Sequence, residues 1–297
     1  MCRLGASIAA VLVLAGCGGS ASADGERRTV VAAFYPLAWA AEGVAGDDVE
    51  VVNLTAPGAE PHDVELTARD VERVRDADLV LYLGAGFMPA LEDAVGGAEH
   101  AVDLLAGQEL RQGDAEHDHG DEPGSDEGNE HELDPHVWLD PNRLAVIART
   151  IAEELGDPAG AIDLVARLED LDGELRDGLA TCERREIVTS HAAFGYLADA
   201  YGLEQIALSG ISPEAEPSPR ALETLVDEVK EERATTVFFE TLVSPRLAET
   251  VAREAGVETA ALDPLEGLDD EALAAGEDYV SVMRANLAAL RDALDCS

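Results

Sequence analysis

Short apolar, β-branched runs alternate with helical patterns along most of this 297-residue chain, and this alternation is the strongest constraint on its fold. In the first half, strands are predicted at residues 29–34, 49–54 and 79–83, with helices at 37–44, 67–76 and 141–155. In the second half, strands are predicted at 186–189, 205–208, 236–239 and 259–262, with helices at 192–201, 218–232, 245–255 and 278–294. Strands that alternate with helices favour parallel sheets flanked by helices. We therefore predict an α/β protein with two similar lobes.

A long amphipathic helix is predicted between the two halves. Its leucines recur at spacings of three and four residues over positions 161–181, which gives one continuous apolar stripe. We expect residues 156–182 to join an N-terminal lobe (29–155) to a C-terminal lobe (183–297) as one long helix.

The N-terminus has the pattern of an export signal. A single Arg3 precedes a short apolar stretch, and the run Leu14-Ala15-Gly16-Cys17 resembles a bacterial lipobox. We predict a lipoprotein signal peptide at 1–16, lipidation of Cys17 and a flexible Gly/Ser/Ala tether at 17–28. The alternative is an ordinary signal peptide with an incidental cysteine. The remaining cysteines, Cys182 and Cys296, form either a disulfide, as in many exported proteins, or two free thiols.

The charge is strongly negative. The formal net charge of −42 disfavours nucleic-acid binding, because a phosphate backbone requires Lys and Arg. Residues 111–132 are rich in Asp, Glu and Gly, lack any apolar period, and are predicted to form a solvated loop. Three histidines of this loop, His117, His119 and His131, either recruit metal ions or belong to a solubilising linker.

Three other histidines lie in segments that the sequence predicts to be ordered. His62 follows the strand predicted at 49–54, His191 follows the strand at 186–189, and His136 lies between two Asp-Pro pairs. Asp263 directly follows the strand at 259–262. Ligands of open parallel sheets bind beyond the carboxyl ends of the strands, and three imidazoles with one carboxylate suit zinc. These four residues are therefore the predicted metal ligands. Glu240, also at a strand end, is expected to face solvent rather than to orient a ligand.

Four segments of the chain have a distinctive sequence: Gly58-Ala59-Glu60-Pro61-His62-Asp63, Asp134-Pro135-His136-Val137-Trp138-Leu139-Asp140-Pro141, Ser190-His191-Ala192-Ala193-Phe194-Gly195-Tyr196 and Leu262-Asp263-Pro264-Leu265. Together they resemble the signature segments of one protein family, the zinc/manganese solute-binding proteins of ABC importers. The resemblance implies two α/β lobes joined by a rigid helix, with the metal in the cleft between them. It also implies that His62, His136, His191 and Asp263 are the ligands, and that His191 indicates the zinc-type branch. Pro61 departs from members with an acid before the first histidine, so Asp263 is the preferred fourth donor, with Glu60 or water as alternatives.

The resemblance implies a function without bond chemistry. We expect a monomeric, lipid-anchored receptor on the outer face of the cell membrane that captures Zn²⁺ and delivers it to an ABC permease. The alternatives are a manganese or mixed zinc/manganese receptor with an adhesin role, and a three-histidine zinc hydrolase. The hydrolase is disfavoured because the chain has no His-Glu-x-x-His motif and no nucleophile elbow.

Overall fold

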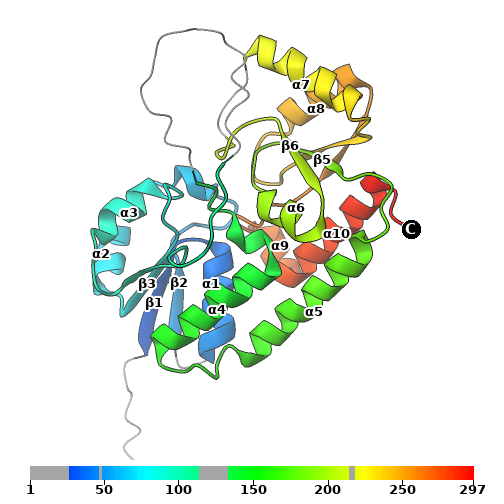
Figure 1. Ribbon diagram of the computed structural model, residues 1–297. Coiled ribbons are helices and arrows are strands. Elements are labelled where there is room, and N and C mark those ends of the chain that lie inside the picture. Colours follow the sequence, from blue (N-terminus) through cyan, green and yellow to red (C-terminus); the bar gives the residue numbers. More distant parts are fainter. Residues whose placement is uncertain (1–26, 47–48, 114–132, 214–217) are drawn as a thin grey trace, which may run out of the picture.

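The computed structural model describes residues 27–46, 49–113, 133–213 and 218–297 (Figure 1). The predicted signal peptide, Cys17 and most of the tether lie outside the described residues, as do His117, His119 and His131. Within the described ranges, no helix is long and apolar enough to cross a membrane.

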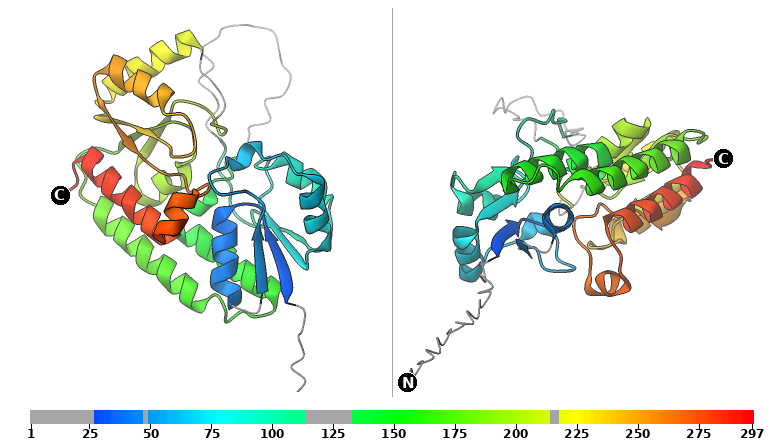
Figure 2. Two further views of the ribbon diagram at one scale, coloured as in Figure 1. Left: turned by 180° about the vertical axis from the view of Figure 1, so that it is seen from behind. Right: turned by 90° about the horizontal axis from the view of Figure 1, so that it is seen from below.

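The N-terminal lobe contains a four-stranded parallel sheet in the order β2-β1-β3-β4. Its strands are β1 (Arg28–Ala32), β2 (Val49–Asn53), β3 (Leu79–Tyr82) and β4 (Ala101–Asp103). Its helices are α1 (Tyr35–Ala45), α2 (Ala68–Asp76), α3 (Pro89–Val95) and α4 (Pro141–Leu155). Because all four strands are parallel, their carboxyl ends lie along one edge of the sheet, and this edge faces the second lobe (Figure 2).

The C-terminal lobe repeats this topology, with a parallel sheet in the order β6-β5-β7-β8. Its strands are β5 (Glu186–Thr189), β6 (Glu204–Ala207), β7 (Thr236–Phe239) and β8 (Glu258–Ala261). Its helices are α6 (Gly195–Tyr201), α7 (Pro219–Glu231), α8 (Arg246–Ala255), α9 (Asp270–Ala275) and α10 (Tyr279–Leu294). In each sheet the strand order reverses beside the first strand of the lobe, which is the position where such folds bind ligands.

The helix α5 (Ile162–Leu179) lies along both lobes. It packs against α4 on one side and against α10 on the other (Figures 1 and 2). Leu164, Leu168, Leu171, Leu175 and Leu179, which form the predicted apolar stripe, are all buried. The predicted α/β fold with two lobes is confirmed, whereas the residue boundaries proposed for the lobes stay a prediction. The short elements α3, β4 and α9 were not predicted.

The caps of the long helices follow ordinary sequence rules. The Asp140 carboxylate accepts a hydrogen bond from the backbone N–H of Asn142 (2.9 Å), and Pro141 occupies the first turn of α4. At the other end of α4, Gly156 has φ 77°, a left-handed conformation that favours glycine. Asp278 and Ser281 form a reciprocal capping box at the start of α10. The Asp140 and Asp278 caps fix where α4 and α10 begin, and Gly156 fixes where α4 ends.

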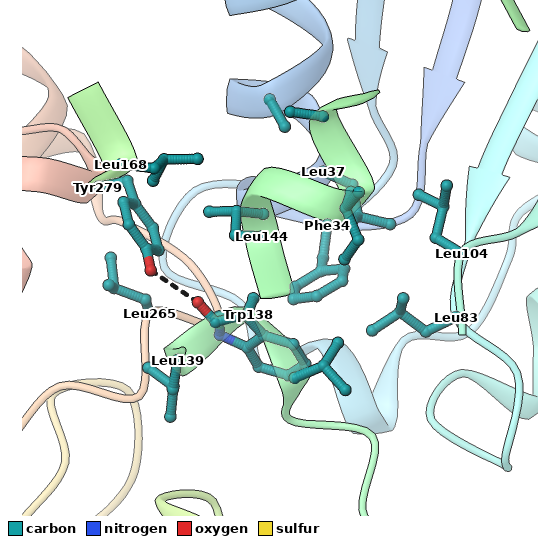
Figure 3. Close-up of a cluster of buried hydrophobic side chains, with 14 of the residues drawn as sticks. Phe34, Leu37, Leu83, Leu104, Trp138, Leu139, Leu144, Leu168, Leu265 and Tyr279 are labelled. Carbon is teal, nitrogen blue, oxygen red and sulfur yellow. Dashed lines mark hydrogen bonds between the residues drawn. The ribbon is translucent and has the colours of Figure 1, made fainter. Parts of the chain in front are cut away.

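The hydrophobic core continues from one lobe to the other around Trp138 (Figure 3). Trp138 is fully buried, and its ring packs edge-on against Phe34 at 4.7 Å between centroids. Its indole N–H donates to the carbonyl oxygen of Pro264 (2.8 Å), and the Tyr279 hydroxyl donates to the Trp138 carbonyl (2.7 Å). Trp138 therefore holds a segment that precedes α4 against a loop of the C-terminal lobe.

A disulfide joins Cys182 to Cys296, so this predicted pair is confirmed. It links the chain just after α5 to the end of α10 across a separation of 114 residues. A loop of this length gives the disulfide a stabilising effect of up to about 4–5 kcal/mol in the chain-entropy description.

Candidate metal centre

Four side chains from both lobes converge on one point. The Oε1 atom of Glu266 lies 3.4 Å from His62 Nε2, 3.3 Å from His136 Nε2 and 3.2 Å from His191 Nε2. The Nε2 atoms of His136 and His191 are 3.3 Å apart. All four donor atoms lie within 4.8 Å of one another. The three predicted histidines are thus brought together, and the fourth member of the group is Glu266.

His62 is presented by a short 3₁₀ helix, Pro61–Asp63, in the loop after β2. The Glu60 side chain caps this helix, because its Oε1 atom accepts a hydrogen bond from the His62 backbone N–H (3.2 Å). The ring of Phe87 packs edge-on against the imidazole at 4.6 Å between centroids. Glu60 therefore positions His62 through the backbone, and it is not one of the four converging donors.

His136 begins another short 3₁₀ helix, Val137–Leu139, and is fully buried. Its Nδ1 atom lies 2.8 Å from Oδ1 of Asp134, and the same oxygen accepts a hydrogen bond from the His136 backbone N–H (2.9 Å). A carboxylate on Nδ1 fixes the ring and directs the Nε2 lone pair toward the centre. This contact follows from the Asp-Pro-His sequence, which places the acid two residues before the ring.

His191 follows β5 and is held in the same way by an acid that follows β7. Its Nδ1 atom lies 2.7 Å from Glu240 Oε1, which also accepts a hydrogen bond from the His191 backbone N–H (3.2 Å). Glu240 is 3% exposed, so the prediction that it faces solvent was wrong. The two strands are neighbours in the sheet, and this places both residues at the same edge. Glu240 orients the His191 ring.

The loop after β8 carries Glu266, and its geometry corrects the prediction for Asp263. The Asp263 carboxylate accepts one hydrogen bond within its own loop, from the Leu265 backbone N–H (2.7 Å), and one from the Thr241 hydroxyl in the loop after β7 (2.9 Å). Leu265 has φ 57°, which reverses the chain and aims Glu266 at the histidines. Asp263 therefore shapes the turn and lies outside the converging group.

Sequence reasoning missed Glu266 because it selected the first acid after the strand. The available signal was an acid within an otherwise apolar segment, Leu265-Glu266-Gly267-Leu268. The loop also contacts the His62 loop across the lobes, since the Gly58 backbone N–H donates to the Leu268 carbonyl (3.1 Å). A backbone hydrogen bond therefore fixes the loop of His62 relative to the loop of Glu266.

The imidazoles and carboxylates of the centre shift one another's pKa values. Burial alone would raise the pKa of Glu266, but the surrounding imidazoles hold it well below its usual value. Burial alone would lower the pKa of His136 and His191, but their carboxylate neighbours raise both, and that of His191 strongly. Burial lowers the pKa of His62. Burial, reinforced by Glu266, raises the pKa of Glu60 to about 9, so Glu60 is neutral at pH 7.

The donor set fits a divalent cation of borderline softness. His62 Nε2 and both carboxylate oxygens of Glu266 are buried without a hydrogen-bond partner among the described residues. Buried polar atoms of this kind normally have a partner, so their convergence requires an explanation. Three imidazole nitrogens and one carboxylate oxygen match the ligand types and the coordination number of tetrahedral zinc sites.

Solvent approaches the centre from the side of His62. A cavity of about 190 Å³ reaches this imidazole and is also lined by Phe87, Pro135 and Ile211. The His62 side chain is 7% exposed, whereas the other three side chains of the group are fully buried. A small ion that enters from this cavity therefore meets His62 first.

The family profile described as "ZnuA: Zinc-uptake complex component A periplasmic" matches residues 30–293. The chain belongs to this family. It is 38% identical to the zinc-binding lipoprotein AdcA of Streptococcus pneumoniae strain R6 over 98% of its own length. The chain spans only 60% of the length of that relative.

A further relative and a solved domain are matched over nearly their full length. The high-affinity zinc uptake system protein ZnuA of Bacillus subtilis is 35% identical, with 96% of this chain and 95% of that protein covered. The crystal structure of the Zn(II)-bound ZnuA-like domain of Streptococcus pneumoniae AdcA superposes with a TM-score of 0.75 at 34% identity. That superposition covers 91% of this chain and 99% of the domain. The family and the fold predicted from the sequence are both confirmed.

Proposed function

We propose that this protein captures Zn²⁺ between its two lobes and delivers it to the permease of an ABC importer. The observation that carries the proposal is the convergence of three imidazole Nε2 atoms and the Glu266 carboxylate within 4.8 Å. The carboxylates of Asp134 and Glu240 contact the Nδ1 atoms of His136 and His191, opposite the Nε2 donors. Membership of a zinc-uptake family supports the same ion. The permease as partner follows from that family alone.

The donor chemistry favours zinc over manganese and capture over hydrolysis. Manganese is a harder ion and prefers more oxygen donors than one carboxylate. A catalytic zinc site keeps a position for water, with three protein ligands, whereas four protein donors converge here. The ion is therefore cargo that the protein binds and releases.

Competition titration tests this function. The metal-stripped full chain is titrated with Zn²⁺ and Mn²⁺ against a chromophoric chelator, beside His191→Ala. We expect tight 1:1 zinc binding, weaker manganese binding, and loss of the tight site in the variant. Tighter manganese than zinc binding, or an unchanged zinc affinity in His191→Ala, would contradict the proposal. An ester-hydrolysis assay of the zinc-loaded protein distinguishes the hydrolase, for which turnover is expected.

Export and recruitment rest on residues outside the described part of the chain. We propose that Cys17 carries a lipid anchor on the extracytoplasmic face, because the relative AdcA of Streptococcus pneumoniae is named a lipoprotein. We also propose that His117, His119 and His131 capture zinc weakly before it enters the centre. Replacing all three by alanine is expected to slow zinc loading at low zinc concentration and to leave the equilibrium affinity of the centre unchanged.

A further inference from the structure

The chain on either side of residues 114–132 forms a short two-stranded stem that adjoins the metal centre. Gln112 and Leu133 form an antiparallel bridge, and the Asp134 backbone N–H donates to the Arg111 carbonyl (3.1 Å). The stem ends in Asp134, whose Oδ1 atom holds both the ring and the backbone N–H of His136. The position of one metal-binding imidazole therefore depends on how this stem is fixed.

Arg111 contacts both lobes from the stem. Its Nε atom lies 3.8 Å from Oδ2 of Asp134, the carboxylate oxygen that His136 does not use. Its Nη1 atom pairs with the Asp199 carboxylate on α6, which belongs to the C-terminal lobe. The Asp134 side chain is 3% exposed and the Arg111 side chain 27% exposed. A buried carboxylate requires such compensation more than an exposed one does.

The backbone of the stem is fixed to the same helix. The Tyr196 hydroxyl accepts a hydrogen bond from the Arg111 backbone N–H (2.8 Å) and donates one to the Asp134 carbonyl (2.8 Å). One phenol of α6 thereby joins the two residues of the stem. Tyr196 is 2% exposed, so this junction is shielded from water.

The close packing at this junction requires a glycine at the start of α6. A Cβ atom on Gly195 would lie 2.6 Å from Arg111 Nε and 3.0 Å from Asp134 Oδ2. The first contact would force the guanidinium to shift, and the second would press on the carboxylate. The absence of a Cβ atom lets the Arg111–Asp134 pair lie directly against the helix. Because α6 begins four residues after His191, the pair that holds His136 packs against the helix that follows His191.

We propose that Arg111 is a positioning residue of the metal centre, which holds the Asp134 carboxylate against His136 while it pairs with Asp199 across the lobes. The proposal rests on the proposed zinc binding. Without the guanidinium, the Asp134 carboxylate can rotate or accept water, and the His136 ring loses its fixed orientation. Zinc then dissociates faster, because His136 Nε2 moves away from the ion more often.

A double-mutant cycle tests the proposal in the full chain. Zinc affinity and dissociation rate are measured by chelator competition for wild type, Arg111→Gln, Asp134→Asn and the double variant. We expect about a 10–100-fold loss of affinity for Asp134→Asn, and about a 3–10-fold loss for Arg111→Gln, which acts one contact further away. In the Asp134→Asn background the effect of Arg111→Gln is expected to fall below about twofold.

Two controls separate positioning from general damage. Arg149→Gln breaks an exposed ion pair with Glu169 on α5 and should leave zinc affinity within about twofold of wild type. Asp199→Asn removes only the contact across the lobes and should cost less than Arg111→Gln. Melting temperatures of the metal-free forms show that each variant folds.

The outcomes are distinct. An affinity of Arg111→Gln equal to wild type, or an equal loss in both Asp134 backgrounds, would overturn the positioning role while zinc binding stands. Failure of the wild-type chain to bind zinc would overturn the proposed function and this role together.

Discussion

Glu266→Gln, compared with Asp263→Asn, separates the two acids of the β8 loop. Both substitutions replace a carboxylate by an amide of nearly the same shape. The Glu266 carboxylate is fully buried and lies 3.2–3.4 Å from the three imidazole Nε2 atoms. The Asp263 carboxylate is bound to the Leu265 backbone N–H and the Thr241 hydroxyl. Only the first substitution is expected to remove a zinc ligand.

The magnitude follows from the charge that is lost. Two unit charges about 4 Å apart interact by about 4 kcal/mol at an effective dielectric constant of 20. The two charges of Zn²⁺ increase this loss, whereas coordination by the amide oxygen and by admitted water reduces it. We therefore expect the free energy of zinc binding to weaken by about 3–4 kcal/mol. This corresponds to a zinc Kd that is weaker by a factor of about 100–1,000. Asp263→Asn keeps an acceptor for Leu265 and should lower stability by about 1 kcal/mol, with little change in Kd.

Thermal denaturation with and without zinc measures the difference. At a zinc concentration 100-fold above the wild-type Kd, bound zinc stabilises the wild type by about 2.7 kcal/mol, or roughly 5–10 °C in Tm. A variant with a Kd about 100-fold weaker gains only about 0.4 kcal/mol, or roughly 1 °C. Asp263→Asn should start from a lower Tm and show the full zinc shift. A normal zinc shift in Glu266→Gln together with a lost shift in Asp263→Asn would refute the reasoning and restore Asp263 as the ligand.

Three further perturbations probe the same structure. Although burial opposes it, the carboxylates of Glu240 and Glu266 raise the pKa of His191 well above its usual value, so protons compete with zinc. We expect zinc affinity to fall as pH falls from 8 to 6, with net proton release on zinc binding, as measured by calorimetry in buffers of different ionisation enthalpy. Reducing the Cys182–Cys296 disulfide should lower the free energy of unfolding by up to about 4–5 kcal/mol in denaturant titrations and leave zinc Kd unchanged. Trp138→Phe removes the indole N–H that holds the Glu266 loop and should weaken zinc binding by about 3–10-fold in chelator competition, with roughly 1 kcal/mol lost in stability.

The elements with strong periodicity could be predicted from the sequence. The strands are short β-branched runs, and α5 has an uninterrupted leucine stripe, so both are specified locally. The helices α3 and α9 and the strand β4 have seven, six and three residues, respectively, and their patterns are too short to separate from loops. Their formation depends on the sheet edge and the core that they pack against.

The histidines of the centre could also be predicted, but the roles of Glu240 and Glu266 could not. His62 and His191 follow strands, and His136 lies in a proline-restricted segment, so local sequence places them. The role of Glu240 depends on a ring 49 residues away in the chain. That of Glu266 depends on the left-handed backbone of Leu265, a conformation that no residue type at that position announces. Contacts of this kind arise only when distant parts of the chain fold together.

The charges around the centre explain how one buried site can be stable with and without its ion. Carboxylates of Asp134, Glu240 and Glu266 contact the imidazoles and, against the opposing effect of burial, raise the pKa of His136 and His191. A proton on an imidazole and a bound Zn²⁺ each place positive charge beside these carboxylates. Because an uncompensated buried charge costs several kcal/mol per ion, this positive charge stabilises the buried site. Affinity then depends on how accurately the Nε2 and Oε1 donors are held.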